Sequence, residues 1–155
     1  MKINWKKLLI CLAIPLGVGG LSAWLTMDAM SVFEQVKQPP LSPPSLLFPV
    51  VWTLLYLLMG FGSYLIARDD RVGRRTTALT VYGIQLAFNF FWSIWFFNLQ
   101  AFWFAFVWLL ILWVLIGLTM VLFYRLNKKA GWCLLPYLIW VTFAGYLNFA
   151  IALLN

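Results

Sequence analysis

Residues 102–124 read FWFAFVWLLILWVLIGLTMVLFY, an unbroken apolar run without a charged side chain. A transmembrane helix needs about 20 consecutive, mostly apolar residues to cross the hydrocarbon core of a bilayer. The apolar residues do not alternate with polar ones at every second position, as they would in the strands of a membrane barrel. Because the backbone must satisfy its own hydrogen bonds in lipid, this run predicts a transmembrane helix.

Four further segments of similar character accompany this run. Of the 155 residues, 65% are hydrophobic and only 10% are charged, whereas a soluble domain carries about 25% charged residues. Such a chain cannot cover its surface with polar groups, so lipid must be its solvent. We therefore predict an all-α integral membrane protein, a single domain over residues 1–155 that forms a bundle of five transmembrane helices. The predicted helices span approximately 8–27, 46–67, 77–97, 102–124 and 132–154.

The basic residues fall almost entirely on one side of the predicted bundle. With five helices, the N-terminus and the loops 68–76 and 125–131 share one face, and Lys37 is the one Lys or Arg of the 11 that lies on the other. Cytoplasmic segments of membrane proteins carry an excess of Lys and Arg. We therefore expect a multi-pass membrane protein with a cytoplasmic N-terminus and an outer C-terminus, which places loop 28–45 outside. The first apolar run is long for the core of a signal peptide, so we expect it to be retained.

The outer loop is rich in proline. Residues 38–52 read QPPLSPPSLLFPVVW and contain most of the chain's 7 prolines. Proline fixes φ and lowers the conformational freedom of a loop. The sequence therefore predicts a stiff, preformed segment rather than a flexible connector.

Polar side chains recur along one stripe of the predicted helix 77–97. Tyr82, Gln85, Asn89 and Ser93 follow one another at three or four residues, the spacing that places side chains on one helix face. An amide without a partner is costly in hydrocarbon, so this face should point into the bundle. Two interpretations remain open: hydrogen bonds that hold the helices together, or a polar anchor in a mostly apolar pocket.

The predicted helix 132–154 places large rings next to small residues. The side chains that share one face are Tyr137, Trp140, Ala144, Leu147 and Asn148. A ring followed one turn later by a small residue leaves a concavity, which suits a flat aromatic ligand. The same pattern suits packing against a neighbouring helix, and both interpretations remain open.

The sequence lacks the residues that several classes of function require. The chain contains no histidine, and Cys11 and Cys133 stand alone in apolar runs, so we predict no metal site and no required cofactor. No predicted helix carries a charged residue in its core, which argues against a proton-coupled transporter and against ordinary acid–base catalysis. The net charge of +7 comes from the basic loops, so we expect no nucleic-acid partner.

Three blocks stand out in order along the chain. They are PPLSPPSLLFPVVWTLLYLLMG at 39–60, QLAFNFFWSIWFF at 85–97 and LLPYLIWVTFAGYLN at 134–148. Together they resemble the TspO/MBR family of tryptophan-rich sensory proteins and mitochondrial translocator proteins, or peripheral benzodiazepine receptors, over nearly the whole chain. The resemblance implies a five-helix membrane bundle, often a homodimer, to which the small pair Gly83 and Ala87 could contribute.

The resemblance also implies a pocket lidded by the long first loop. In that family the pocket binds porphyrins, including protoporphyrin IX and haem, as well as cholesterol and benzodiazepine-type drugs. By motif, the ligand-binding residues here would be Pro43, Pro44, Trp52, Tyr56, Asn89, Trp92, Trp140, Ala144 and Leu147.

Three functions follow from the resemblance. The first is a membrane receptor or sensor for porphyrins. The second is light- and oxygen-dependent porphyrin breakdown, reported for some bacterial members, in which Trp52 and Trp140 would be catalytic. The third is a transporter of tetrapyrroles or sterols.

Two positions depart from the family's pattern. Many members carry Trp before Ser/Thr-Pro-Pro in the first loop, where this chain has Leu41. The contact between lid and ligand is therefore expected to differ. The vertebrate cholesterol motif ends in a basic residue, and none follows Trp132 here. Cholesterol binding is therefore not expected.

Overall fold

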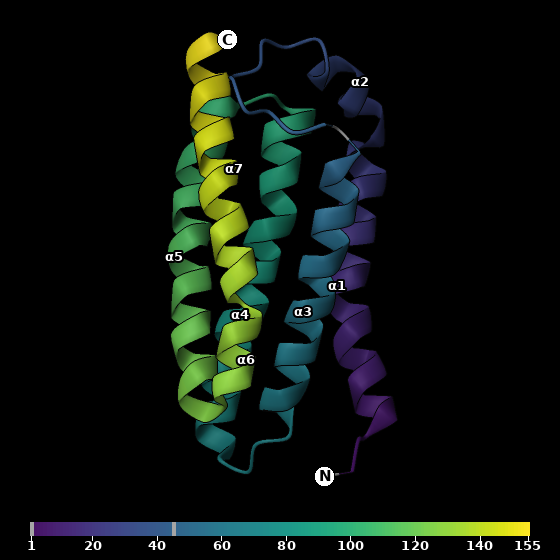
Figure 1. Ribbon diagram of the computed structural model, residues 1–155, viewed down its shortest axis with the longest axis vertical. Helices are drawn as coiled ribbons and strands as arrows, with labels where there is room; N and C mark the ends of the chain where they lie inside the picture. The colour runs from purple at the N-terminus through teal and green to yellow at the C-terminus, as the bar shows by residue number, and fades with distance from the viewer. Residues whose placement is uncertain (1, 45) are drawn as a thin grey trace.

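The computed structural model describes residues 2–44 and 46–155, and only the backbone of residues 32 and 33. Within these ranges every regular element is a helix, and the long helices stand side by side with the two termini at opposite ends of the bundle (Figure 1). The elements are α1 (Trp5–Thr26), η1 (Met27–Ala29), α2 (Met30–Phe33), α3 (Leu47–Ala67), α4 (Val72–Ser93), η2 (Ile94–Asn98), α5 (Phe102–Leu126), α6 (Lys128–Cys133) and α7 (Leu135–Leu154).

Five segments of the described chain are long and apolar enough to cross a membrane. They are Trp5–Ala29, Leu47–Ala67, Val72–Asn98, Phe102–Leu126 and Lys128–Leu154. The predicted fold class, an all-helical membrane protein with five spanning helices, is thereby confirmed.

The third span extends beyond its predicted ends. α4 begins at Val72, before the predicted start at residue 77, and its first turn contains Arg74 and Arg75. Hydropathy marks the part of a helix that lies in hydrocarbon, and charged residues continue the helix beyond it. At the other end the chain forms the π-helical turn η2, in which the Leu99 amide donates to the Ile94 carbonyl at 3.1 Å.

The predicted helix 132–154 is two helices that meet at Leu134. Pro136 has no backbone N–H and cannot donate to the carbonyl four residues back. It therefore occupies the first turn of α7, where that donor is not needed. The Leu134 amide donates instead to the Gly131 carbonyl, at 3.1 Å.

The contact between α1 and α3 depends on a glycine. A Cβ atom at Gly60 would lie 2.8 Å from both the carbonyl oxygen of Cys11 and the Cα of Leu12. Real Cβ atoms do not come so close to backbone, so only a residue without a side chain permits this approach of the two helices.

A chain of hydrogen bonds crosses the middle of the bundle. The Tyr56 hydroxyl donates to Asn89 Oδ1 at 2.8 Å, Asn89 Nδ2 donates to the Tyr137 hydroxyl at 2.8 Å, and that hydroxyl donates to Gln85 Oε1 at 2.7 Å. All four side chains are buried. The amides of the polar stripe thus have partners on α3 and α7, which is the interhelical bonding that the sequence left as one interpretation.

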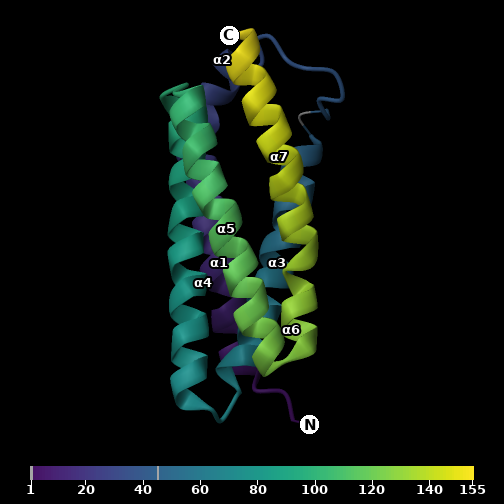
Figure 2. The same cartoon turned by 90° about the vertical axis from the view of Figure 1, so that its left-hand side faces the viewer.

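The loop between α2 and α3 covers one end of the bundle. It crosses from α2 to the C-terminal end of α7 and returns to α3 (Figure 1), and the turned view shows it descending beside α7 (Figure 2). The Lys37 amide donates to Asn155 Oδ1 at 3.2 Å, and Asn155 Nδ2 donates to the Lys37 carbonyl at 2.9 Å. The Tyr146 hydroxyl donates to the Pro40 carbonyl at 2.7 Å. These bonds attach the loop to α7 at two points.

Candidate functional site

A cavity of about 260 Å³ lies beneath this loop, between α1, α3, α4 and α7. None of the described residues that line it is charged. Nor does the structure, over the residues it describes, bring together three His, Cys, Asp or Glu side chains that could hold a metal ion. The site is therefore suited to a neutral or aromatic group rather than to a buried ion.

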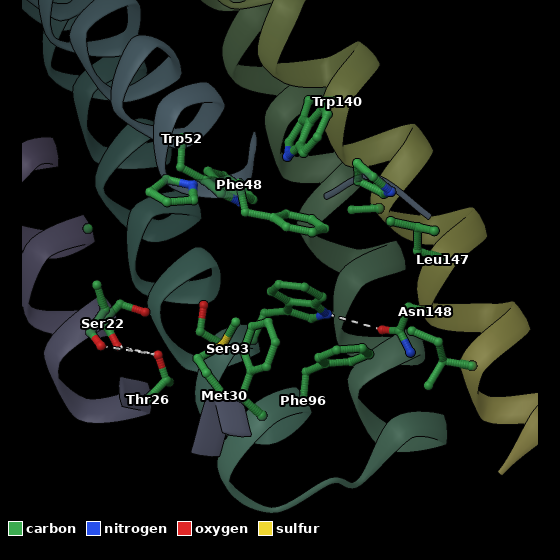
Figure 3. A pocket seen from close by; sticks show the side chains of 18 of the residues that line it. Ser22, Thr26, Met30, Phe48, Trp52, Ser93, Phe96, Trp140, Leu147 and Asn148 are labelled. Atoms are coloured by element: carbon green, nitrogen blue, oxygen red, sulfur yellow. Dashed lines mark hydrogen bonds between the residues drawn. The ribbon is translucent and has the colours of Figure 1, made fainter. Parts of the chain in front are cut away.

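The α7 wall combines a large ring with a small residue. Trp140, Ala144 and Leu147 line the cavity on successive turns, and the single methyl of Ala144 leaves room between its two larger neighbours. The Trp140 ring meets the edge of Phe48 at a centroid distance of 5.9 Å. Its indole nitrogen is shielded from solvent and has no acceptor among the described residues. Figure 3 shows this nitrogen on the cavity side of the ring.

The α3 wall is a pair of stacked rings. Trp52 stacks on Tyr56 with centroids 5.7 Å apart, and its edge meets Tyr137 at 6.2 Å. The Tyr56 hydroxyl is held by Asn89. On the other side, a Cβ atom at Gly19 of α1 would overlap the Tyr56 ring. The position of Tyr56 is therefore fixed both by a hydrogen bond and by the absence of a side chain.

The base of the cavity joins three helices. Trp92 Nε1 of α4 donates to Asn148 Oδ1 of α7 at 3.1 Å, drawn as a dashed line in Figure 3. Asn148 Nδ2 in turn donates to the Phe102 carbonyl of α5 at 2.9 Å. The Trp92 ring stacks on Phe96 with centroids 5.0 Å apart. These contacts hold the indole in place, so the base is preformed.

Hydroxyl groups line the side of the cavity opposite α7. Ser22 and Thr26 come from α1 and Ser93 from α4, and Figure 3 shows them across the cavity from Leu147 and Asn148. Thr26 Oγ1 donates to the Ser22 carbonyl at 2.9 Å. The hydroxyls of Ser22 and Ser93 have no hydrogen-bond partner within the described ranges, although Ser22 is only 5% exposed. They can therefore serve a ligand.

The structure brings most of the predicted ligand-binding residues together. Those that line the cavity are Pro43, Trp52, Tyr56, Trp92, Trp140, Ala144 and Leu147. Pro44 and Asn89 are not among the lining residues. Pro44 is exposed in the loop, and Asn89 is 2% exposed behind the cavity wall, where it binds two tyrosine hydroxyls.

Leu41, the position where the family resemblance led us to expect a tryptophan, lies outside the cavity. It is 81% exposed, and its φ of 71° lies in the left-handed region that a leucine rarely adopts. The loop residues that line the cavity are Gln38, Ser42 and Pro43. In this chain the part of the loop that covers the cavity therefore contributes small and polar side chains in place of an aromatic ring.

Sequence reasoning missed the α1 side of the cavity and Phe48. Ser22 and Thr26 are four residues apart and are the only hydroxyl residues of the predicted helix 8–27. The same spacing identified the polar face of α4, so this signal was present. Phe48, in contrast, is one apolar residue among many at the start of α3.

The chain matches the TspO/MBR family over residues 11–154. It is 36% identical to the tryptophan-rich protein TspO of Chlorobaculum tepidum over 96% of this chain and 95% of that protein. It is 34% identical to the tryptophan-rich sensory protein of Cereibacter sphaeroides over 100% of this chain and 95% of that one. It is also 32% identical to the translocator protein of Bos taurus over 76% of this chain and 70% of the relative. With matches of this length, the chain belongs to the TspO/MBR family.

Proposed function

We propose that this membrane protein is a receptor or sensor that binds porphyrins, such as protoporphyrin IX or haem, in the cavity beneath the loop. The observation that carries the proposal is the presence of Trp52 and Trp140 on the α3 and α7 walls of one uncharged cavity. Aromatic side chains stack favourably on flat conjugated rings. The word "sensory" in the name of the Cereibacter sphaeroides relative agrees with such a role.

A hydrogen-bond donor at the cavity wall also supports the proposal. The Trp140 indole nitrogen is buried and lacks a partner among the described residues. A buried donor without an acceptor costs about 1–3 kcal/mol. A ligand oxygen placed beside this nitrogen would remove that cost, so the site favours a ring system with polar substituents over a plain hydrocarbon.

The size of the cavity implies that the loop moves when a porphyrin binds. Pockets for drug-sized ligands measure about 300–1,000 Å³, and this one is about 260 Å³. A porphyrin must therefore displace part of the loop. The hydrogen bonds of Asn155 and Tyr146 to the loop are the contacts that oppose this movement.

Titration of the purified protein with protoporphyrin IX tests the site. Ala144→Phe would fill the space between Trp140 and Leu147, so we expect at least a roughly tenfold loss of affinity. Trp140→Phe should also weaken binding, whereas Trp132→Phe, at the exposed start of the fifth span, should not. Equal affinity of the wild type and all three variants would exclude this cavity as the binding site.

Light-dependent breakdown of the bound porphyrin is a second candidate function. It is favoured by the stacking of Trp52 on Tyr56, because neighbouring rings at 5.7 Å could supply an electron to a photo-excited ligand. Illumination in the presence of oxygen should then give a discrete open-chain tetrapyrrole, more slowly in Trp52→Phe at equal occupancy. Bleaching at the rate of free porphyrin would exclude this activity.

A further inference from the structure

A second hollow lies at the other end of the bundle, where α4 begins and α5 ends. Its volume is about 310 Å³. The residues that line it are Gly73, Arg74 and Thr77 of α4, and Leu122, Arg125 and Leu126 of α5. The hollow lies far from the cavity beneath the loop, since the loop covers the opposite end of these helices (Figure 1).

Two guanidinium groups give the hollow an uncompensated positive charge. Arg74 and Arg125 come from opposite walls, and neither has an ion pair or a hydrogen bond to the part of the chain that is described. The carboxylate of Asp69 is already engaged, because Arg71 binds it at 2.8 Å. The hydrogen bonds from the Arg71 side chain and backbone lower the pKa of Asp69 to about 2, so that pair persists at neutral pH.

The backbone adds to the positive potential of the hollow. No side chain caps the N-terminus of α4, so the first-turn amides and the helix dipole face outward. A Cβ atom at Gly73 would have nothing within 4 Å, which shows that the space beside this turn is open. The site therefore combines two cations, free amide donors and room for a tetrahedral anion.

The side of the hollow toward the middle of the bundle is apolar. Leu122, which lies one turn before Leu126 on the way to the middle of α5, is half-buried at this side. One turn from Leu122, Leu118 is 46% exposed, and two turns from Thr77, Ile84 is 45% exposed. Apolar side chains thus continue from the two arginines along α4 and α5, as the binding of an acyl chain would require.

The location of the hollow selects a lipid as its ligand. Val72–Asn98 and Phe102–Leu126 are both membrane spans, and the hollow lies at their ends, where phospholipid headgroups are found. Basic pockets between transmembrane helices are suited to anionic headgroups. We propose that Arg74 and Arg125 bind the phosphodiester of an anionic phospholipid, whose acyl chain lies in the groove between α4 and α5.

Native mass spectrometry of the full chain released from nanodiscs tests the proposal. Nanodiscs of phosphatidylglycerol mixed equally with phosphatidylcholine should give wild-type protein that retains one phosphatidylglycerol about tenfold more often than phosphatidylcholine. The variant Arg74→Gln/Arg125→Gln should lose this preference. The variant Lys128→Gln/Lys129→Gln removes the same charge from the neighbouring α6, outside the hollow, and should keep it.

The two double variants separate a built site from diffuse surface charge. Equal loss of phosphatidylglycerol in both would overturn the proposal, as would equal retention of the two lipids by the wild type. Porphyrin affinity reports that Arg74→Gln/Arg125→Gln is folded, because the cavity is at the other end. A control with inorganic phosphate distinguishes a lipid headgroup from free phosphate as the ligand of the hollow. If inorganic phosphate raises the melting temperature of lipid-free protein as much as phosphatidylglycerol does, the hollow is a site for free phosphate and the lipid assignment is wrong.

Discussion

The Tyr56 hydroxyl donates a 2.8 Å hydrogen bond to Asn89 Oδ1 directly behind the wall of the cavity. Tyr56 lines the cavity and Asn89 does not. Asn89 is therefore a positioning residue: it holds the ring of Tyr56, on which Trp52 stacks, and also binds Tyr137. A residue that the family resemblance predicts in the pocket is thus bonded to two tyrosines and does not line the cavity.

Asn89→Ala should destabilise the bundle and weaken porphyrin binding. The substitution leaves the buried Tyr56 hydroxyl without its acceptor, which costs about 1–3 kcal/mol, while the Tyr137 hydroxyl keeps its bond to Gln85. The melting temperature in detergent and a protoporphyrin IX titration measure the two effects. Asn98→Ala, whose side chain donates to the Leu25 carbonyl at an exposed position, is the matched control and should change little.

Tyr56→Phe distinguishes positioning from direct contact. It removes the same hydrogen bond while leaving Asn89 in place, so it should reproduce the loss of affinity. If Tyr56→Phe binds normally and Asn89→Ala does not, Asn89 contacts the ligand itself.

Gly19→Ala should distort the cavity although it adds a single methyl group. The new Cβ would overlap the Tyr56 ring, so the ring or α1 must shift. We expect a loss of about 1–3 kcal/mol in stability and weaker porphyrin binding. Gly20→Ala is the matched control, because a Cβ there meets nothing within 4 Å and the change favours the helix by up to about 1 kcal/mol. Similar behaviour of the two variants would show that Tyr56 is not confined by α1.

Sequence patterns identified the membrane-spanning helices, which depend on the lipid environment. They missed features that depend on local helix geometry. The run at 102–124 identified α5 within two residues, because hydropathy depends directly on the hydrocarbon environment. The break at Leu134 was missed, because the predicted helix began at residue 132 and a proline is tolerated in the first turns of a helix. The role of Asn89 stayed open between interhelical hydrogen bonding and ligand contact, because a motif identifies the residue but does not reveal whether it lies in the cavity wall or behind it.

Leu41→Asn should stabilise the protein without weakening porphyrin binding. A leucine with φ of 71° carries backbone strain of about 1–2 kcal/mol, and asparagine tolerates this conformation better. Leu41→Ala is the control, because it also removes most of this side chain, which is 81% exposed, but keeps the Cβ atom that causes the strain at this φ. A higher melting temperature is expected for the first variant alone. A marked loss of affinity in Leu41→Asn would indicate that this side chain turns inward when a ligand is present.

Tyr146→Phe and Asn155→Ala should accelerate porphyrin association. Each removes hydrogen bonds that attach the loop to α7, and one such bond contributes about 1 kcal/mol, or roughly a fivefold change in the open population. Stopped-flow quenching of tryptophan fluorescence measures the rate. Tyr124→Phe, at the other end of the bundle, should leave it unchanged. An unchanged rate in both loop variants would mean that porphyrin enters by another route.

Lys37→Gln should weaken binding of a porphyrin dicarboxylate but not of its dimethyl ester. The cavity has no charged lining residue, so ionised carboxylates would lose hydration inside it and should stay at the rim. Lys37 is exposed beside Gln38, a lining residue of the loop, and its backbone is held by Asn155. Because the cation is exposed, we expect only a two- to fivefold effect, by analogy with surface ion pairs of about 0.2–1 kcal/mol, and a smaller one at high salt. Titrations with protoporphyrin IX and with its dimethyl ester measure the change in affinity for each ligand, and Lys129→Gln is the control. An equal loss for acid and ester would mean that Lys37 acts on the fold of the loop rather than on the ligand's charge.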